Sequence, residues 1–298
     1  MRHAILGVGG VGGLIAAALA KSGESVTLVL RPEVIENYPA ELALESPLGS
    51  FAVPVGRTTK VTQPFDVLWV AVKATQLDAA LRSVTVDPEG LGAVVPLLNG
   101  IDHVALLRAR FGHDRVVPAS IAVETERVAP GKILHRSPGV RITVSAIGEK
   151  RLESTIEKLR QFGFSCQFNP DEAKILWNKM GILAPFALTS TASGLPAGEI
   201  NRDPVWRKRL EASIRETCAV STASGTPLAP EGFIRYLDSM PATLRSSMQK
   251  DVAAGNPPEL DAIAGPVLRG AMEHGIDVPV TTELVAIVRG KSTAATAD

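Results

Sequence analysis

The sequence predicts an α/β protein in which an N-terminal, Rossmann-type doubly wound sheet is followed by an all-α domain. Short β-type runs alternate with helical segments up to about residue 168, and a glycine-rich turn follows the first run. From Asp171 onward the pattern is mainly helical. The 298 residues suffice for two domains. Asn169-Pro170 marks a boundary, which gives domains 1–168 and 169–298.

The first domain begins with a predicted strand–helix–strand unit. Residues 3–6 form the first strand, 11–21 the helix and 25–30 the second strand. Two continuous apolar runs, 65–72 and 93–98, have the composition of buried parallel strands. We therefore expect a parallel sheet in this domain.

Further strands are predicted after Pro118, and helices after Asp171. Runs at 121–128, 132–135 and 140–144 surround a Pro130-Gly131 turn, and we expect them to extend the sheet in antiparallel orientation. Helices are expected near residues 171–192, 203–224, 230–240, 243–253, 258–273 and 281–290. Pro185 lies inside the first of these and is expected to kink the helix or to end its regular hydrogen bonding.

Charge and cysteine content restrict the function classes. Thirty-one basic residues balance thirty-one acidic ones, so no net field draws the chain to nucleic acid or to an acidic membrane. Cys166 and Cys218 match neither metal-ligand nor disulfide spacings, which predicts free thiols, a cytoplasmic protein and no metal site. The uncharged run 4–20 imitates a signal peptide, but it is short and contains five glycines, and no later segment could span a bilayer.

The glycine-rich turn is a candidate dinucleotide site. Gly7, Gly9 and Gly12 fit the G-x-G-x-x-G pattern between a strand and a helix. Such a turn lets backbone N–H groups approach a pyrophosphate at the positive end of a helix. The alternative is that the glycines only allow the helix to pack closely on the strand.

Arg31 follows the second strand, where the choice between NAD and NADP is made. An acidic residue there would bind the ribose hydroxyls of NAD, whereas an arginine offers a fixed positive charge to a 2′-phosphate. We therefore expect NADP(H) as cofactor. The alternative is that Arg31 is an ordinary solvated residue of a surface loop.

Two polar residues follow the apolar strands, Lys73 after one and Asn99 after the other. Because ligands bind at the carboxyl ends of the strands in open α/β sheets, both positions are candidates for the cofactor and substrate site.

Lys179 lies on the apolar face of a predicted helix. The apolar residues at helical spacing around it are Ile175, Leu176, Ile182, Leu183 and Phe186. Partial burial would lower the pKa of its amine toward values useful for proton transfer. The alternative is a lysine whose amine reaches solvent.

Glu259 follows Pro257-Pro258 at the start of a predicted helix, where the residues alone favour a simple complement to the helix dipole. Ser246-Ser247 lies within a predicted helix and indicates nothing further by itself.

In their order and spacing, these blocks resemble the ketopantoate reductase (2-dehydropantoate 2-reductase) family over nearly the whole chain. The matching blocks are the Gly7–Gly12 turn, Arg31, residues 66–74 with Gln76, Asn99-Gly100, Trp177-Asn178-Lys179, Ser246-Ser247, Glu259-Leu260-Asp261 and residues 274–279. The resemblance implies NADPH-dependent reduction of ketopantoate, a 2-oxo acid, to pantoate on the route to pantothenate and coenzyme A.

The resemblance also implies the roles of individual residues. Lys179 would donate a proton to the carbonyl oxygen while hydride arrives from the nicotinamide, which is consistent with general-acid and electrostatic catalysis. Glu259 would orient Lys179 or bind the substrate hydroxyl, and Ser247 would contact the substrate. Lys73 and Asn99 would lie at the cofactor and substrate end of the first domain.

Three positions depart from the family pattern. Leu183, Ala187 and Ala197 stand where the family usually has substrate-facing asparagines. The loss of three hydrogen-bonding groups, each worth about 1–3 kcal/mol, would weaken recognition of ketopantoate. One alternative is therefore a related reductase of a more apolar 2-oxo acid. Others are a non-catalytic NADPH-binding protein and a hydroxyacid or opine dehydrogenase. A homodimer is compatible with the neutral charge.

Overall fold

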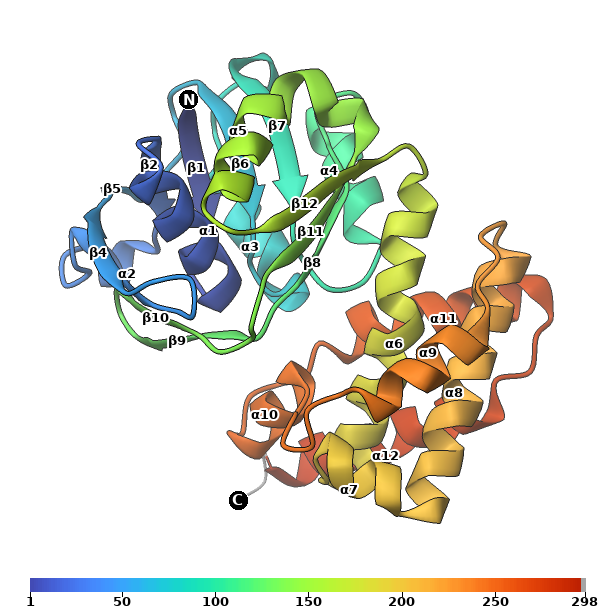
Figure 1. The fold of residues 1–298 in the computed structure, drawn as a ribbon. Helices are drawn as coiled ribbons and strands as arrows, with labels where there is room; N and C mark the ends of the chain where they lie inside the picture. The colour runs from blue at the N-terminus through green and yellow to red at the C-terminus, as the bar shows by residue number, and fades with distance from the viewer. Residues whose placement is uncertain (296–298) are drawn as a thin grey trace. The chain divides into compact units, whose positions relative to one another are not determined.

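The computed structural model describes residues 1–295 and divides the chain into two compact units (Figure 1). The first unit comprises Met1–Leu98 and Asp102–Ile175, and the second comprises Asn99–Ile101 and the chain from Leu176 onward. The division falls inside helix α6 (Glu172–Ser193), a few residues after Asn169-Pro170.

The first turn of α6 is held by side chains of the first unit. Arg108 donates a hydrogen bond from Nη2 to Glu172 Oε2 at 2.6 Å, and Ser145 Oγ donates to Glu172 Oε1 at 2.8 Å. Because these partners lie 64 and 27 residues away in the sequence, local pattern could not place the division inside the helix.

A parallel sheet of five strands forms the centre of the first unit, in the order β5-β2-β1-β6-β7. Its strands are β1 (Arg2–Leu6), β2 (Ser25–Val29), β5 (Gly56–Thr58), β6 (Phe65–Val70) and β7 (Leu91–Pro96). Helix α1 (Gly10–Lys21) joins the first two, and its buried face, from Gly12 to Leu19, packs into the same hydrophobic core as the strands. The predicted strand–helix–strand unit and the parallel sheet are thus confirmed.

The strands after Pro118 differ from the expectation. Strands β9 (Thr125–Ala129) and β10 (Lys132–His135) do form an antiparallel hairpin around the Pro130-Gly131 turn. They do not extend the five-stranded sheet, however, because β10 pairs in parallel with β3 (Glu41–Glu45), which also pairs with β4 (Phe51–Pro54). The expected extension of the sheet is therefore wrong: alternation of residue types indicates a strand but not which distant strand it pairs with.

A third sheet completes the strands of the first unit. Its order is β12-β11-β8, with β8 (Ala119–Ala122) antiparallel and β12 (Ser165–Asn169) parallel to β11 (Arg141–Ser145). The remaining helices of the unit are α2 (Pro32–Ile35), α3 (Leu77–Leu81), α4 (His103–Phe111) and α5 (Glu149–Gln161).

The described residues of the second unit form helices and loops only, as the sequence predicts. Besides α6, the helices are α7 (Ala197–Arg202), α8 (Pro204–Ala223), α9 (Pro230–Asp238), α10 (Ser247–Ala253), α11 (Leu260–His274) and α12 (Pro279–Ala295). Helix α6 continues past Pro185 to Ser193, so the proline does not end it. One core contains buried side chains of α6, α10, α11 and α12, among them Met180, Met248, Ile263 and Leu284.

No helix within residues 1–295 is both long and apolar enough to cross a membrane.

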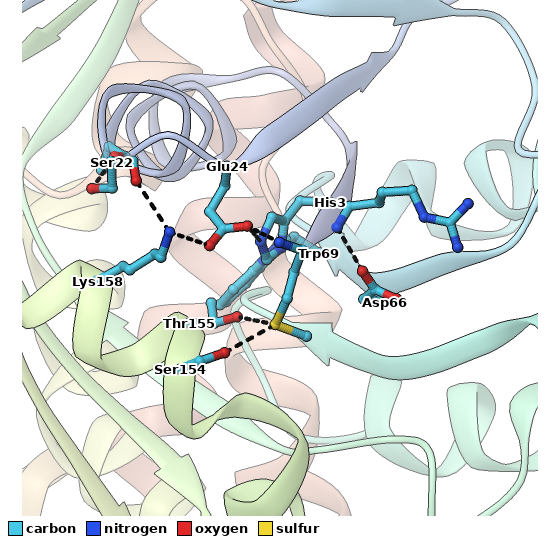
Figure 2. A network of polar contacts seen from close by, with 11 residues as sticks. His3, Ser22, Glu24, Asp66, Trp69, Ser154, Thr155 and Lys158 are labelled. Carbon is cyan, nitrogen blue, oxygen red and sulfur yellow. Dashed lines mark hydrogen bonds and ion pairs between the residues drawn. The ribbon is translucent and has the colours of Figure 1, made fainter.

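A buried polar network lies at the amino end of β1 (Figure 2). The His3 side chain is fully buried, accepts a hydrogen bond at Nδ1 from Trp69 Nε1 at 3.3 Å and places Nε2 3.6 Å from Glu24 Oε2. Burial alone would raise the pKa of Glu24, but hydrogen bonds from Lys158, at 2.6 Å, and from the α-amino group of Met1 lower it. The network thus holds a carboxylate against a neutral imidazole.

The pH dependence of stability should reveal the buried imidazole. Burial lowers the pKa of His3 to about 4, and the Glu24 carboxylate opposes this only in part. The unfolded chain, with a histidine pKa of about 6.5, binds more protons than the folded chain between pH 4 and 6.5. The free energy of unfolding should therefore fall by up to about 3 kcal/mol as the pH falls through this window.

Urea unfolding of the wild type and of His3→Asn, measured at several pH values between 4 and 7, tests this expectation. Asparagine keeps an acceptor for Trp69 but does not titrate, so the contribution of His3 to the slope should vanish. Equal slopes for both proteins would contradict the assignment.

Candidate functional site

The carboxyl ends of four parallel strands lie side by side at one end of the central sheet (Figure 1). The register pairs Leu6 of β1 with Val29 of β2 and with Val70 of β6, and it pairs Val70 with Pro96 of β7. The segments that follow these residues therefore leave the sheet on the same side. They are the glycine-rich turn, Arg31, Lys73 and the chain that leads to Asn99.

Packing requires two of the three motif glycines. Gly7 has φ +100°, and a Cβ there would lie 2.5 Å from Val72 N; a Cβ on Gly12 would lie 2.0 Å from Gly7 O. A Cβ on Gly9 would meet no atom of the described protein within 4 Å, and its φ of −86° suits any residue. Close packing therefore accounts for Gly7 and Gly12 but not for Gly9.

The turn leads directly into α1, and no side chain caps the start of that helix. Gly9 is the N-cap of α1 and supplies no side-chain hydrogen bond to the N–H groups of the first turn. These groups carry the positive end of the helix dipole. The arrangement fits a pyrophosphate, because Gly9 has no side chain that would separate an anion from the N–H donors of the first turn of α1.

Strand β9 braces the same turn, which the sequence did not predict. Arg127 Nη1 donates to Val8 O at 3.3 Å, and Thr125 Oγ1, which donates to Leu134 O at 3.1 Å, lies 3.4 Å from Gly10 O. More than a hundred residues separate these two side chains from the turn, so no local pattern could have identified their contacts with it.

Arg31 and Lys73 lie at the ends of β2 and β6. The Arg31 side chain is 75% exposed, and its Nε lies 3.3 Å from Glu33 Oε1. An exposed ion pair of this kind contributes little to stability, so the guanidinium can bind a ligand at small cost. Lys73 is half-buried and precedes a short 3-10 helix, Ala74–Gln76.

A second group of polar residues lies within the helical unit. Asn99 Nδ2 donates to Glu259 Oε2 at 3.3 Å, and Glu259 is only 6% exposed. Gly100 has φ +84°, and a Cβ there would lie 2.3 Å from Ala262 O. Residues 99 and 100 therefore lie directly against the first turn of α11, which fixes the Glu259 carboxylate next to the Asn99 amide.

Lys179 projects from α6 and interacts electrostatically with Glu259. Burial lowers the pKa of the half-buried Lys179 to about 8, while the negative charge of Glu259 opposes the shift. The ammonium group is then mostly protonated at neutral pH and loses its proton more readily than a solvated lysine does. Such a group can act as a general acid beside a fixed carboxylate.

Ser247 and Ser246 have different surroundings. Ser247 is exposed and is the first residue of α10. Ser246 is buried and accepts a hydrogen bond from Gln249 N at 3.1 Å as the N-cap of that helix. No separate role for Ser246 was predicted, although serine followed three residues later by glutamine is a recognised N-cap pattern.

The three residues that depart from the family pattern pack among other apolar side chains. Leu183 is half-buried, lies one turn after Lys179 and packs against the same core as Ile101. Ala187 is fully buried and Ala197 is 2% exposed. Leu183 and Ala187 follow the lysine at successive turns of α6, and Ala197 is the first residue of α7, so none of the three positions offers an amide.

Other chemistry has little support among residues 1–295. No group of three or more histidine, cysteine, aspartate or glutamate residues there could hold a metal ion. Both thiols are free, and burial raises the pKa of Cys166 and of Cys218 to about 11, which makes them poor nucleophiles.

Sequence comparison identifies two matching family models. The model described as ketopantoate reductase PanE/ApbA matches residues 3–149, and the model of the C-terminal part of that family matches residues 172–292. A 2-dehydropantoate 2-reductase of Caulobacter vibrioides is 30% identical over 301 residues, which cover 96% of this chain and 97% of the relative.

Solved structures show the same fold. A PanE/ApbA family ketopantoate reductase from Ralstonia eutropha superposes with a TM-score of 0.87 at 25% identity, covering 99% of this chain and all of its own. A D-mandelate dehydrogenase, solved with NADH and anilino(oxo)acetate, has a TM-score of 0.88 at 17% identity and covers 99% of both chains. At that identity the likeness concerns the fold alone.

Proposed function

We propose, because the chain belongs to the ketopantoate reductase family PanE/ApbA, that it reduces ketopantoate to pantoate with NADPH. The chain is an oxidoreductase that acts on CH–OH groups, of the 2-dehydropantoate 2-reductase type. The substrate, the preference for NADPH and the roles of individual residues are parts of the proposal. Its free thiols suit the reducing cytoplasm, where we place the reaction.

The cofactor would bind at the carboxyl ends of the strands of the central sheet. Gly9 leaves room for the pyrophosphate next to the first turn of α1, and the exposed guanidinium of Arg31 would bind the 2′-phosphate. Lys73, at the end of β6, would add a positive charge at the same end of the sheet. When bound, NADPH supplies the hydride for reduction.

The helical unit would supply the proton. The Lys179 ammonium would hydrogen-bond the carbonyl oxygen of the 2-oxo acid, stabilise the negative charge that develops there and transfer one proton to it. The hydroxyl of pantoate and a neutral lysine result. Glu259, fixed by Asn99, would keep the amine oriented and protonated, and Ser247 would contact the substrate.

One observation carries this proposal: a half-buried lysine, whose pKa burial lowers to about 8, interacts electrostatically with the buried Glu259 in a chain of this family. Retaining a lysine in such surroundings costs free energy, which favours a chemical use. A non-catalytic NADPH-binding protein would not need it.

Oxidation of NADPH by the purified protein tests the proposal. With saturating ketopantoate we expect rapid, substrate-dependent loss of NADPH absorbance, and slower turnover with NADH. Binding of NADPH without turnover of ketopantoate or of any other 2-oxo acid would contradict the proposal and favour the non-catalytic alternative.

A related reductase of a more apolar 2-oxo acid is the second candidate. It is favoured by Leu183, which is half-buried one turn after Lys179, and by the buried Ala187 and Ala197. Branched 2-oxo acids without a hydroxyl, assayed in parallel with ketopantoate, separate the two candidates. A higher kcat/KM for the branched acids would support the second candidate, in which the missing amides at these three positions change substrate selection.

The cofactor preference gives a separate prediction. Arg31→Ala should lower kcat/KM for NADPH about 10- to 100-fold, because a charge-assisted contact contributes about 1.5–3 kcal/mol. It should leave kcat/KM for NADH nearly unchanged, since NADH has no 2′-phosphate. Kinetics with both cofactors measure this.

A matched control is Arg160→Ala, which removes another partly exposed Arg–Glu pair, with Nη1 of Arg160 3.5 Å from Glu157. It should change neither cofactor's kinetics. If Arg31→Ala lowers kcat/KM equally for NADPH and NADH, Arg31 does not bind the 2′-phosphate.

A further inference from the structure

Two buried serine hydroxyls connect α6 to the start of α10. Ser190, near the end of α6, is fully buried, and Ser246, immediately before α10, is 7% exposed. Their Oγ atoms lie 2.8 Å apart. The two residues are 56 positions apart in the sequence, so this contact exists only in the folded unit.

The hydrogen bonds around the pair can all be satisfied in one direction. Ser190 Oγ donates to Ala187 O at 3.3 Å, and Ser246 Oγ accepts the Gln249 N–H at 3.1 Å. Because each hydroxyl has one proton, Ser246 then donates to Ser190. A continuous chain of hydrogen bonds therefore runs from the first turn of α10 to the backbone of α6.

Neighbouring contacts hold this turn of α10 in place. Gln249 is 4% exposed and donates from Nε2 to Leu195 O at 3.2 Å. Met248 is 1% exposed and packs in the core that α6 and α11 share. Before the turn, Ala197 N donates to Leu244 O at 2.9 Å. Ser247, between these anchored residues, is the one whose side chain stays exposed.

The anchored turn is attached to the helix that carries the lysine. Ser190 follows Lys179 by eleven residues on α6, which at about 3.6 residues per turn places both on the same side of the helix. A shift of the turn that contains Ser247 would therefore change the spacing between Ser247 and Lys179.

We infer that Ser246 and Ser190 are positioning residues, which set the place of the Ser247 hydroxyl relative to Lys179 and so control affinity for the 2-oxo acid. The inference rests on the proposed function, in which Ser247 contacts the substrate. Neither Ser246 nor Ser190 touches the substrate in this account. Their effect passes through the hydrogen-bond chain.

Steady-state kinetics of Ser246→Ala test the inference. We expect the KM for the 2-oxo acid to rise about 10-fold, because an unsatisfied buried partner and a lost N-cap both loosen the turn. The KM for NADPH should stay within about twofold. Ser246→Thr keeps the hydroxyl and should restore the KM for the acid.

A double-mutant cycle with Ser247→Ala identifies the route of the effect. If Ser246 acts through Ser247, then Ser246→Ala should raise the KM of the Ser247→Ala protein by no more than about twofold. Ser190→Ala should behave like Ser246→Ala.

The matched control is a second buried hydroxyl pair in the same unit. Ser213 Oγ lies 2.9 Å from Thr281 Oγ1, and both residues are fully buried. Ser213→Ala should lower the melting temperature without changing the KM for the acid by more than about twofold. A similar KM increase in Ser213→Ala would mean that any loosening of the unit has this effect, and it would overturn the inference.

The kinetics also distinguish failure of this inference from failure of the proposed function. An unchanged KM in Ser246→Ala, or an equal increase with and without the Ser247 hydroxyl, overturns this inference while an active wild type leaves the proposed function intact. A wild-type protein that turns over no 2-oxo acid overturns both.

Discussion

Replacing Lys179 by alanine is expected to lower kcat for the 2-oxo acid by about 10²–10⁴-fold, the range typical of a lost general acid. In the proposed mechanism the amine supplies both the proton and the positive charge that stabilises the developing oxyanion, and no other lysine of the sequence lies within four residues of it on this helix. Binding of NADPH, followed by its fluorescence, should be unchanged.

Lys174→Ala is the control for this substitution, because Lys174 is an exposed lysine of the same helix. It should retain wild-type kcat. Activity of Lys179→Ala within about threefold of the wild type would remove Lys179 from the mechanism.

The pH profile distinguishes a proton donor from a simple positive charge. With the pKa of Lys179 lowered to about 8, the reductive rate should fall above that pH as the ammonium is lost. Glu259→Gln removes the carboxylate that raises the pKa, so the descending limb should move to lower pH. A profile that does not move would place Glu259 outside the electrostatic control of Lys179.

The second large effect is expected at Gly9. Its replacement by alanine should raise the Kd for NADPH by about 10²-fold or more, because the methyl group would occupy the space at the N-cap of α1 where the pyrophosphate is proposed to bind. Losing two charge-assisted hydrogen bonds, at about 1.5–3 kcal/mol each, accounts for this magnitude. The melting temperature without cofactor should stay the same, since the new Cβ meets no protein atom within 4 Å.

Two comparisons complete the binding experiment. Gly12→Ala places a Cβ 2.0 Å from Gly7 O, so it should weaken binding and also lower the melting temperature of the cofactor-free protein. Gly139→Ala, at a position with open space around the new Cβ, should change neither quantity. If Gly9→Ala binds NADPH as tightly as the wild type, the pyrophosphate does not lie at this turn.

Much of the fold follows from local pattern. The alternation of residue types indicates β1, α1 and β2, and the apolar runs indicate β6 and β7, because a parallel strand buried on both faces needs such runs. The candidate positions Arg31, Lys73 and Asn99 follow from the same pattern, since each comes shortly after one of these strands.

Strand partners were not predictable in the same way. Strand β10 pairs with β3 across some ninety residues, and the strands β3, β4, β5 and β12 have only three to five residues each, which is too short for a local pattern to specify a partner. The partner of each strand depends on contacts between residues that are distant in the sequence, which is a property of the assembled unit.

The sequence by itself determined the class of the fold, the glycine turn and the identity of the half-buried lysine, because periodicity and residue type are local. Only the tertiary structure decided that Asn99 holds Glu259, that packing explains Gly12 but not Gly9, and that Ser246 is fixed to Ser190. Each of these depends on contacts between residues distant in the sequence or on the space around one atom. Such contacts form when the elements pack together, and no local pattern records them.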